Sequence, residues 1–481
     1  MKKLLATLLV LVLVCALFAG CEKRNKKNST TPTPTLTPTA APTDVPTPTP
    51  DTTPEFDPNA KSEGVMTYAQ YAAAEKDDEV TIECFVQNHQ SWWDDKITVY
   101  AADGDGAYFL YNMACSEEDS KKLVPGTKIK VKGYKAEWSG EVEVDEGATF
   151  EFVESESWIA PVVDVTALLG TDDLVKKQNQ FVSFKGMTVS KAALYKLDGS
   201  GSQGDDLYFD VALDGKVYTF TVESYLCGKD TDVYKAVEAL KVGDIVDLEG
   251  FLYWYNGVNP HITSCKVLGN VNAKSEGVMT YEQYAAAAKD DEVTIECYVQ
   301  NHQSWWEDKV TVYAADGDGA YFLYNMACTE EDSKKLVPGT KIKVKGYKTE
   351  WSGEVEVDEG ATFEFEEGSY IAPAVDVTAL LGTDDLIKKQ NQYVSFKGMT
   401  VSKAALYKWD GSGSQGDDLY FDVTLDGKNY TFTVESYLCG KDTDVYKAVE
   451  ALKVGDKIDM EGFLYWYNGV NPHITKVSAA Q

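Results

Sequence analysis

The sequence predicts an all-β protein with short helices, in which four tandem modules follow a Thr/Pro-rich tether. Three observations support this prediction. The chain after residue 60 contains a unit of about 210 residues that occurs twice. Short segments of this unit alternate apolar and polar side chains, which is the period of a half-buried strand. Turn pairs such as Asp214-Gly215 separate these segments, as they do in β-hairpins.

The first 20 residues have the composition of a secretory signal peptide. A basic start with two lysines precedes an apolar run over residues 4–18, which is too short for a stable membrane span. The run ends in Ala19-Gly20-Cys21, which resembles the bacterial lipobox, where small residues precede a cysteine. The resemblance implies cleavage before Cys21 and a lipid on its thiol, so we expect an exported protein anchored to the outer face of the bacterial cell membrane. The alternative is an ordinary secretory signal with a chance cysteine.

Residues 21–60 have the composition of a linker that follows the lipid anchor. A basic cluster at residues 22–27 could lie on anionic headgroups. Thr and Pro then alternate, and nine of the 15 prolines lie between Pro32 and Pro58. Such a segment cannot bury apolar area, so we expect it to be disordered, extended and semi-rigid.

The rest of the chain is a tandem duplication. Residues 61–152 recur as residues 274–365 with seven differences, and residues 160–263 recur as residues 372–475 with nine. A unit of this length that occurs twice indicates duplicated domains rather than a solenoid. Each copy divides again at its centre, which predicts four modules with these boundaries: 61–153, 154–270, 271–366 and 367–477.

Both modules of a copy have the same predicted order of elements. The first module begins with a strand over residues 80–87, where Val80, Ile82 and Cys84 alternate with polar neighbours. It continues with strands 96–102 and 107–112, a short helix 116–123, and strands 128–134 and 141–144. The second module has a strand 182–189, strands 207–213 and 216–222, a helix 232–240, and strands 245–253 and 261–267.

This order resembles the OB-fold, a five-stranded barrel with a helix between strands three and four. The resemblance is carried by the segments VPGTKIKVKGYKAEWSGEVEV and LKVGDIVDLEGFLYWYNGVNPHI, with a turn at the end of the helix and an aromatic hairpin. It implies four tandem OB-like five-stranded barrels. It also implies that ligands meet the outer face of strands one to three and the loops that join strands 1–2 and 4–5.

Aromatic residues gather at these positions. On the outer face of the first module we expect Phe85, Tyr100, Phe109 and Tyr111, and flat rings beside polar side chains suit stacking on a sugar or a base. The other interpretation, which packing of apolar rings favours, is that the preceding helix over residues 66–76 or a neighbouring module covers this face. The predicted ligand-binding residues lie in the loops: His89, Gln90, Trp92, Trp93, Trp138 and Trp254 in the first copy, and His302, Gln303, Trp305, Trp306, Trp351 and Trp466 in the second.

The acidic composition narrows the function. Lys and Arg total 45 against 77 Asp and Glu, which gives a net charge of −32, and Arg24 is the only arginine. Phosphate contacts need a surplus of basic side chains, so nucleic-acid binding through a broad basic surface is disfavoured. The chain lacks a GxSxG motif, a P-loop and a dinucleotide fingerprint, so we expect no enzyme.

The sequence therefore predicts a non-catalytic surface lipoprotein that binds an extracellular glycan or wall polymer. Its alternatives are a nucleic-acid-binding module of an extracellular nuclease-like system and a purely structural surface spacer. The oligomeric state stays open.

No cofactor is expected. Asp103 and Asp105, and the segment 198–206, offer oxygen ligands for calcium, but the second lacks the position-6 glycine and position-12 glutamate of an EF-hand loop. Zinc motifs such as CxxC and HExxH are missing from the sequence. An exported protein permits pairing of Cys84 with Cys115 and of Cys297 with Cys328, whereas the odd number of thiols after Cys21 favours reduced cysteines.

Overall fold

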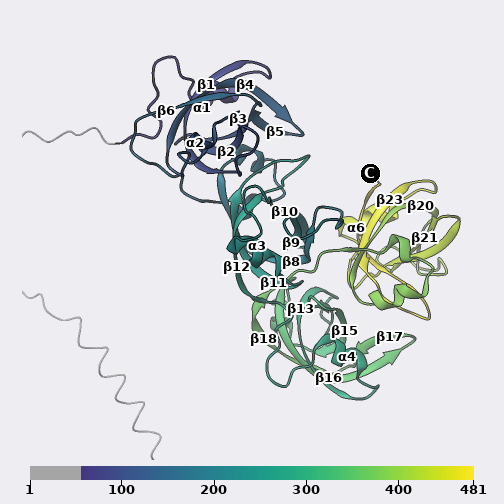
Figure 1. Cartoon of the computed structure of the whole chain (residues 1–481). Helices are drawn as coiled ribbons and strands as arrows, with labels where there is room; N and C mark the ends of the chain where they lie inside the picture. The colour runs from purple at the N-terminus through teal and green to yellow at the C-terminus, as the bar shows by residue number, and fades with distance from the viewer. Residues whose placement is uncertain (1–55, 481) are drawn as a thin grey trace, which may run out of the picture. The chain divides into compact units, whose positions relative to one another are not determined.

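The computed structural model describes residues 56–480 (Figure 1). The predicted signal peptide, the lipidation site Cys21 and the linker up to residue 55 lie outside the described residues. The described chain consists mainly of strands, which form four closed barrels. Short helices connect some of the strands or precede a barrel. This confirms the predicted fold class. No helix between residues 56 and 480 has the length and apolar character needed to cross a membrane.

Barrel 1 is a closed sheet of five strands with a sixth strand at its edge. Its order is β1-β2-β3-β5-β4, and pairing of β4 with β1 closes the barrel. β3 and β5 run parallel, whereas the other neighbours are antiparallel. Its elements are α1 (Tyr68–Ala73), β1 (Glu79–His89), β2 (Lys96–Ala102), β3 (Ala107–Ala114), α2 (Glu117–Ser120), β4 (Lys128–Trp138), β5 (Glu141–Val144) and β6 (Thr149–Phe152).

Barrel 2 repeats this topology, with the order β8-β9-β10-β12-β11 and closure between β11 and β8. The short strand β7 adds to β8 in parallel. Its elements are β7 (Val163–Asp164), β8 (Phe181–Tyr195), β9 (Leu207–Leu213), β10 (Lys216–Val222), α3 (Asp232–Glu238), β11 (Asp244–Phe251) and β12 (His261–Asn270), and the 3-10 turns η1 (Thr166–Leu168) and η2 (Leu174–Lys177) lie between β7 and β8.

The second copy forms barrels 3 and 4 with the same strand orders. Barrel 3 comprises α4 (Tyr281–Ala286), β13 (Glu292–His302), β14 (Lys309–Ala315), β15 (Ala320–Ala327), α5 (Glu330–Ser333), β16 (Thr340–Trp351), β17 (Glu354–Val357) and β18 (Thr362–Ser369). Barrel 4 comprises β19 (Val375–Asp376), η3 (Thr378–Leu380), η4 (Asp384–Lys389), β20 (Tyr393–Tyr407), β21 (Leu419–Leu425), β22 (Lys428–Val434), α6 (Asp444–Glu450), β23 (Lys457–Phe463) and β24 (His473–Ala479).

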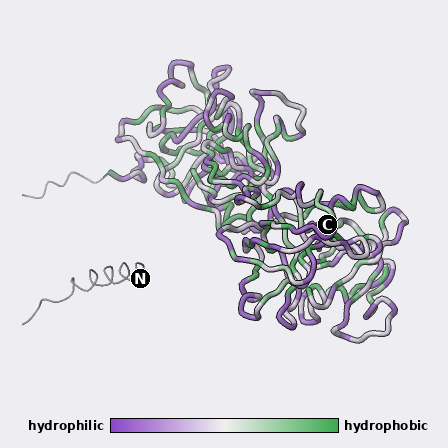
Figure 2. Tube along the Cα trace, turned by 90° about the horizontal axis from the view of Figure 1, so that it is seen from below, coloured by the Kyte–Doolittle hydropathy of each residue, from purple (hydrophilic) through white to green (hydrophobic). Residues whose placement is uncertain are grey.

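Each barrel encloses its own apolar core. Val80, Ile82 and Cys84 of β1 are at most 1% exposed, so the alternation seen in the sequence faces the inside of barrel 1. Figure 2 shows apolar stretches running through the folded part of the chain, and hydrophilic stretches at many of its outer bends. Gly133 of β4 lies close against Ala148, because a Cβ atom at Gly133 would be 2.7 Å from the Cβ of Ala148. Only glycine fits such a close approach.

The first residue of each copy is attached to the first barrel of that copy by the same polar contacts. Lys61 Nζ donates to Asp103 Oδ2 at 2.6 Å, and Tyr108 Oη donates to the same carboxylate oxygen at 2.7 Å. The side chains of Lys61 and Asp103 are buried, at 10% and 0% exposure. In the second copy, Lys274 pairs with Asp316 at 2.7 Å. Each copy therefore begins with a lysine whose charge is neutralised inside its own first barrel.

Candidate functional site

The outer face of β2 and β3 in barrel 1 is covered by barrel 2. Tyr100 and Phe109 lie outside the core of barrel 1, as the alternation predicts, yet they are only 0% and 3% exposed. The Tyr100 ring stacks on Phe251 with 4.2 Å between ring centroids, and Phe109 contacts Tyr253 at 5.3 Å. We call this contact the barrel junction. The strand face on which OB-like barrels bind ligands is therefore an interface between two barrels.

The other outward strand aromatics have different surroundings. Phe85 is fully buried and contacts Phe56 and Trp158 at 6.0 and 5.5 Å between ring centroids. Tyr111 remains 38% exposed. Of the two interpretations of this face, covering holds for Phe85, Tyr100 and Phe109, because neighbouring segments and barrel 2 exclude water from them.

A buried hydrogen bond crosses the junction. Tyr100 Oη and His261 Nδ1 are 2.6 Å apart, and the corresponding atoms of Tyr313 and His473 are 2.9 Å apart. Burial lowers the pKa of His261 to about 3, because the imidazolium cation would lose its hydration. The histidine is therefore neutral at physiological pH, and it satisfies the tyrosine hydroxyl within the interface.

The two tryptophans of the β1–β2 loop have different roles. Trp92 is half-buried, and its Nε1 donates to the carbonyl oxygen of Cys115 at 2.8 Å, which fixes the loop to the end of β3. Trp93 is 66% exposed at the tip of the hairpin. Asp94 and Asp95 form the turn with φ of 50° and 59°. Of this pair, only Trp93 presents its ring to solvent.

The same loop also anchors the junction. The Ser91 amide donates to the carbonyl oxygen of Tyr225 in barrel 2 at 2.7 Å. His89 Nδ1 is hydrogen-bonded to the carbonyl oxygen of Gln90 at 2.7 Å, and both residues are half-buried. His89 thus contacts its own loop, whereas the Gln90 side chain faces Glu223 of barrel 2.

An exposed aromatic pair joins the β4–β5 hairpin of barrel 1 to the β11–β12 loop of barrel 2. Trp138 and Tyr255 are 55% and 45% exposed, and their rings are 5.2 Å apart with 34° between their planes. The Asn256 amide donates to the carbonyl oxygen of Ser139 at 2.7 Å, which holds the two loops together. Two aromatic rings from separate barrels therefore form one solvent-facing surface, which we call the aromatic pair.

Trp254 lies next to Tyr255 in the β11–β12 loop and packs beneath the exposed surface. It is half-buried and packs against the core of barrel 2. Its ring lies over Gly140, where a Cβ atom would be 2.9 Å from Trp254 Cδ1. The Trp254 amide donates to Glu141 Oε2 at 2.8 Å, and Gln178 Nε2 donates to the same oxygen at 3.2 Å. Trp254 thus positions the loop that carries Tyr255.

The second copy reproduces each of these contacts. Trp351 and Tyr467 are 55% and 48% exposed, and their rings are 5.2 Å apart with 36° between planes. Trp306 is 61% exposed at its hairpin tip, whereas Trp305 donates to the Cys328 carbonyl oxygen at 2.8 Å. The remaining predicted residues of this copy have the same placement as in the first: His302, Gln303 and Trp466.

The candidate metal ligands and the cysteines of the described residues can be placed individually. No group of three or more His, Cys, Asp or Glu side chains between residues 56 and 480 is placed to hold a metal ion. Asp103, a calcium-ligand candidate in the sequence, is engaged by Lys61 and Tyr108. The seven cysteines in this range, including Cys84 and Cys115, are free thiols. Burial raises the pKa of the Cys115 thiol to about 11.

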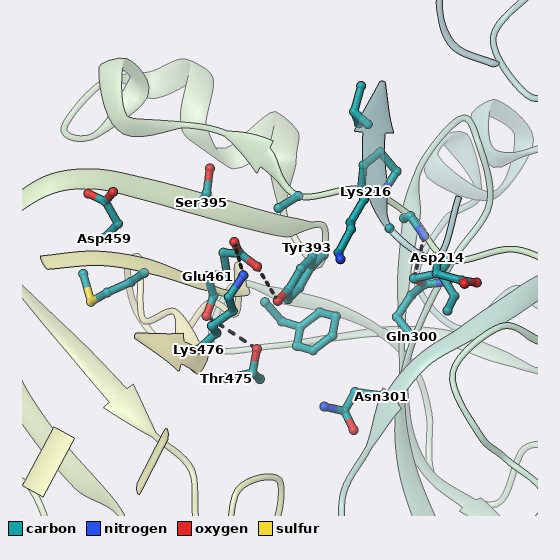
Figure 3. A pocket seen from close by; sticks show the side chains of 18 of the residues that line it. Asp214, Lys216, Gln300, Asn301, Tyr393, Ser395, Asp459, Glu461, Thr475 and Lys476 are labelled. Carbon is teal, nitrogen blue, oxygen red and sulfur yellow. Dashed lines mark hydrogen bonds and ion pairs between the residues drawn. The ribbon is translucent and has the colours of Figure 1, made fainter. Parts of the chain in front are cut away.

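Barrel 4 borders a cavity of about 890 Å³ with both polar and apolar lining residues, shown in Figure 3. Tyr393 Oη donates to Glu461 Oε2 at 3.0 Å, and Lys476 Nζ donates to Glu461 Oε1 at 2.8 Å. The first copy has Phe181 and Ser264 at the positions of Tyr393 and Lys476. This network therefore belongs to the second copy alone.

Sequence reasoning misses two features of the aromatic pair. It places Tyr255 only within a loop, although Trp138 and Tyr255 stand at equivalent hairpin positions of adjacent modules. It treats Glu141 as a strand residue without a role. The signal for both is long-range, because Trp138 and Tyr255 are brought together by docking of one barrel onto the next.

Comparisons with known proteins give no family assignment. No protein-family model matches the chain, and no curated protein matches it. Among solved structures, the chain is similar to the p204 HINb domain with 12% identity and a TM-score of 0.16, over 38% of this chain and 99% of that one. The tetrameric p202 HIN2 matches with 10% identity and a TM-score of 0.20, over 40% and 96%.

A third structure, of a murine DNA binding protein bound with double-stranded DNA, matches with 12% identity and a TM-score of 0.16, over 38% of this chain and 97% of that one. Likenesses at these scores support no inference about function. The fold and the surface themselves define a chain of paired OB-like barrels with an exposed aromatic pair at each junction.

Proposed function

We propose that this chain is an exported, lipid-anchored, non-catalytic protein that binds a neutral glycan or wall polymer at its two aromatic pairs. The observation that carries the proposal is the pairing of Trp138 with Tyr255, repeated as Trp351 with Tyr467. In each pair, two large rings from different barrels are held side by side and about half exposed. Flat rings of this kind bind the apolar face of a sugar while their polar atoms stay in water.

The charge of the chain supports a neutral ligand. With a net charge of −32, the protein repels polyanions at long range. Many of its lysines are paired with acidic neighbours, such as Lys132 with Glu79 at 3.1 Å and Lys185 with Asp164 at 3.0 Å. An uncharged polysaccharide is not repelled in this way. The exposed side-chain amide of Asn256, beside the pair, offers hydrogen bonds to sugar hydroxyls.

Duplication supports a surface-binding role. Two near-identical sites on one chain raise the overall affinity for a repetitive polymer when both sites are engaged, because the second contact forms at high effective concentration. A lipid on Cys21 and a linker rich in Thr and Pro would hold these sites at a membrane surface. We therefore interpret the protein as an adhesive element of the cell envelope.

Binding of the full chain to insoluble polysaccharides tests this proposal. We expect the protein to sediment with at least one of cellulose, chitin, xylan or purified cell wall, and Trp138→Ala with Trp351→Ala to weaken this binding about tenfold or more. The matched control is Trp409→Ala, since Trp409 is 76% exposed but lies on the β20–β21 loop. Equal binding by the double variant and the control would overturn the role of the aromatic pairs.

Nucleic-acid binding is the second candidate, because OB-like barrels bind oligonucleotides as well as oligosaccharides. The double-stranded DNA bound in one of the compared structures is a property of that protein. A gel shift with single- and double-stranded DNA at low ionic strength separates the candidates. Retardation that falls steeply with added salt would favour nucleic acid over the glycan. Absence of binding to both ligand classes would leave the structural spacer.

A further inference from the structure

Each barrel junction contains three buried glutamates. Glu141 and Glu143 lie on β5 of barrel 1, and Glu223 follows β10 of barrel 2. Their exposures are 0%, 6% and 8%. The second copy has Glu354, Glu356 and Glu435 at these positions, with exposures of 0%, 5% and 9%. Carboxyl groups are rarely buried to this extent without a cation, because an ionised carboxylate loses its hydration there.

The hydrogen bonds of these glutamates satisfy them only in part. Glu141 Oε2 accepts from Trp254 and Gln178, whereas Glu141 Oε1 is buried without a hydrogen-bond partner. Glu223 accepts from the backbone amides of Tyr225 and Leu226 at 3.0 and 2.8 Å. These bonds tie the carboxyls to the loops of the junction, but they do not supply a countercharge.

The surroundings of the three carboxyls are neutral or acidic. No lysine is among the groups that act most strongly on them. The side chain of Gln90, from the β1–β2 loop, also faces Glu223. Several titratable groups face the carboxyls, or each other across the junction: Tyr71, Tyr100, Tyr111 and Asp145 from barrel 1, and Asp206, Tyr208, Cys227, Tyr253 and His261 from barrel 2.

We propose that each barrel junction is a pH-sensitive contact, which stays closed while its buried glutamates are protonated and loosens as they ionise. The inference rests on the buried carboxyls between the two barrels and does not depend on glycan binding. Opening of the junction exposes these carboxyls to water, where they ionise freely. Alkaline conditions would then separate the two rings of each aromatic pair, because Trp138 and Tyr255 belong to different barrels.

The direction of the effect follows from the protonation of the two states. Burial raises the pKa of Glu141 to about 8 and those of Glu143 and Glu223 to about 7, and the second copy shows the same values. An exposed glutamate ionises near its ordinary value of about 4.5. The open junction therefore releases protons. The opening constant, which is the ratio of open to closed junctions, rises up to about tenfold per pH unit for each carboxyl between its exposed and its buried pKa. Above about pH 8 the dependence flattens.

Hydrogen exchange of the full chain between pH 5 and pH 8 tests the proposal. The amides of Ser91 and Asn256 report opening, because both donate across the junction. The perturbation is Glu143→Gln, because glutamine has the same shape as glutamate but cannot ionise. The second junction of the same molecule, with Glu356 intact, is the matched control. Peptides with Ser91 differ in mass between the copies, since Asp94 corresponds to Glu307, and peptides from Asn256 differ when they include Ser264, which corresponds to Lys476.

We expect the opening constant of the intact junction, relative to the Glu143→Gln junction, to rise about tenfold or more from pH 5 to pH 7. The exposed-site variant Glu137→Gln should leave the two junctions equal. A ratio that stays constant within about twofold over this range would overturn the proposal. If circular dichroism shows that Glu143→Gln does not fold, Glu223→Gln tests the proposal in the same way. The second junction, with Glu435 intact, is then the control.

Discussion

Replacing Phe251 with alanine should open the first barrel junction without unfolding either barrel. Phe251 is 2% exposed, stacks on Tyr100 at 4.2 Å and 15°, and contacts Phe181 at 5.2 Å. It belongs to the junction cluster rather than to the core of barrel 2. Burial of a phenylalanine contributes about 1.5–3 kcal/mol, and a stacked aromatic pair adds about 0.5–1.5 kcal/mol. With the cavity left behind, Phe251→Ala should cost about 3–5 kcal/mol.

This loss corresponds to an opening constant raised by about two to three and a half powers of ten, since each 1.4 kcal/mol is about tenfold. Hydrogen exchange of the amides of Ser91 and Asn256 measures it, and the second junction, with Phe463 intact, serves as the reference in the same sample. Phe152→Ala, at a position that is 40% exposed, is a control for loss of a ring elsewhere in barrel 1. Less than about fivefold faster exchange at both amides would refute the reading of this cluster as the main apolar contact between the barrels.

Two further substitutions probe the junction. Tyr100→Phe removes the hydroxyl partner of the buried His261 Nδ1, so urea unfolding should show a loss of about 1–3 kcal/mol, and an unchanged stability would argue against a hydrogen bond that matters. Gly140→Ala places a Cβ atom 2.9 Å from Trp254 Cδ1 at a φ of 88°, so it should cost about 1–3 kcal/mol and shift tryptophan fluorescence to the red. A Gly140→Ala variant with the same fluorescence spectrum as the unaltered protein would contradict this contact.

The fold could be predicted from the sequence because its signals are local. Alternation around Val80 and Ile82 gives the strands, and Asp214-Gly215 gives a hairpin turn that the structure contains between β9 and β10. The edge strands β6 and β7 escape prediction, because they are only four and two residues long, too short for a period to be recognised. β8 runs on to Tyr195, beyond the predicted end at residue 189, because bulges carry the strand past Lys191.

The candidate site could be predicted only in part. Trp93 and Trp138 are exposed, as hairpin tips of an aromatic sequence suggest. Tyr100 and Phe109 look the same in the sequence whether water or a second barrel covers them, because alternation reports only which face of a strand a residue occupies. Which barrel docks onto which face is decided by complementary surfaces far apart in the chain, as in the contact of Tyr100 with Phe251.

The lysine that opens each copy has a consequence for how this chain can lengthen. Lys61 and Lys274 both find their carboxylate partners within the copy that they begin, at Asp103 and Asp316. Neither lysine depends on a carboxylate that precedes it in the chain. A further copy inserted ahead of Lys274 would therefore contain both the lysine at its start and the aspartate that neutralises it. Unequal recombination between the two near-identical halves would therefore yield longer or shorter arrays that fold without further adjustment, so natural length variants of this protein should differ by whole copies.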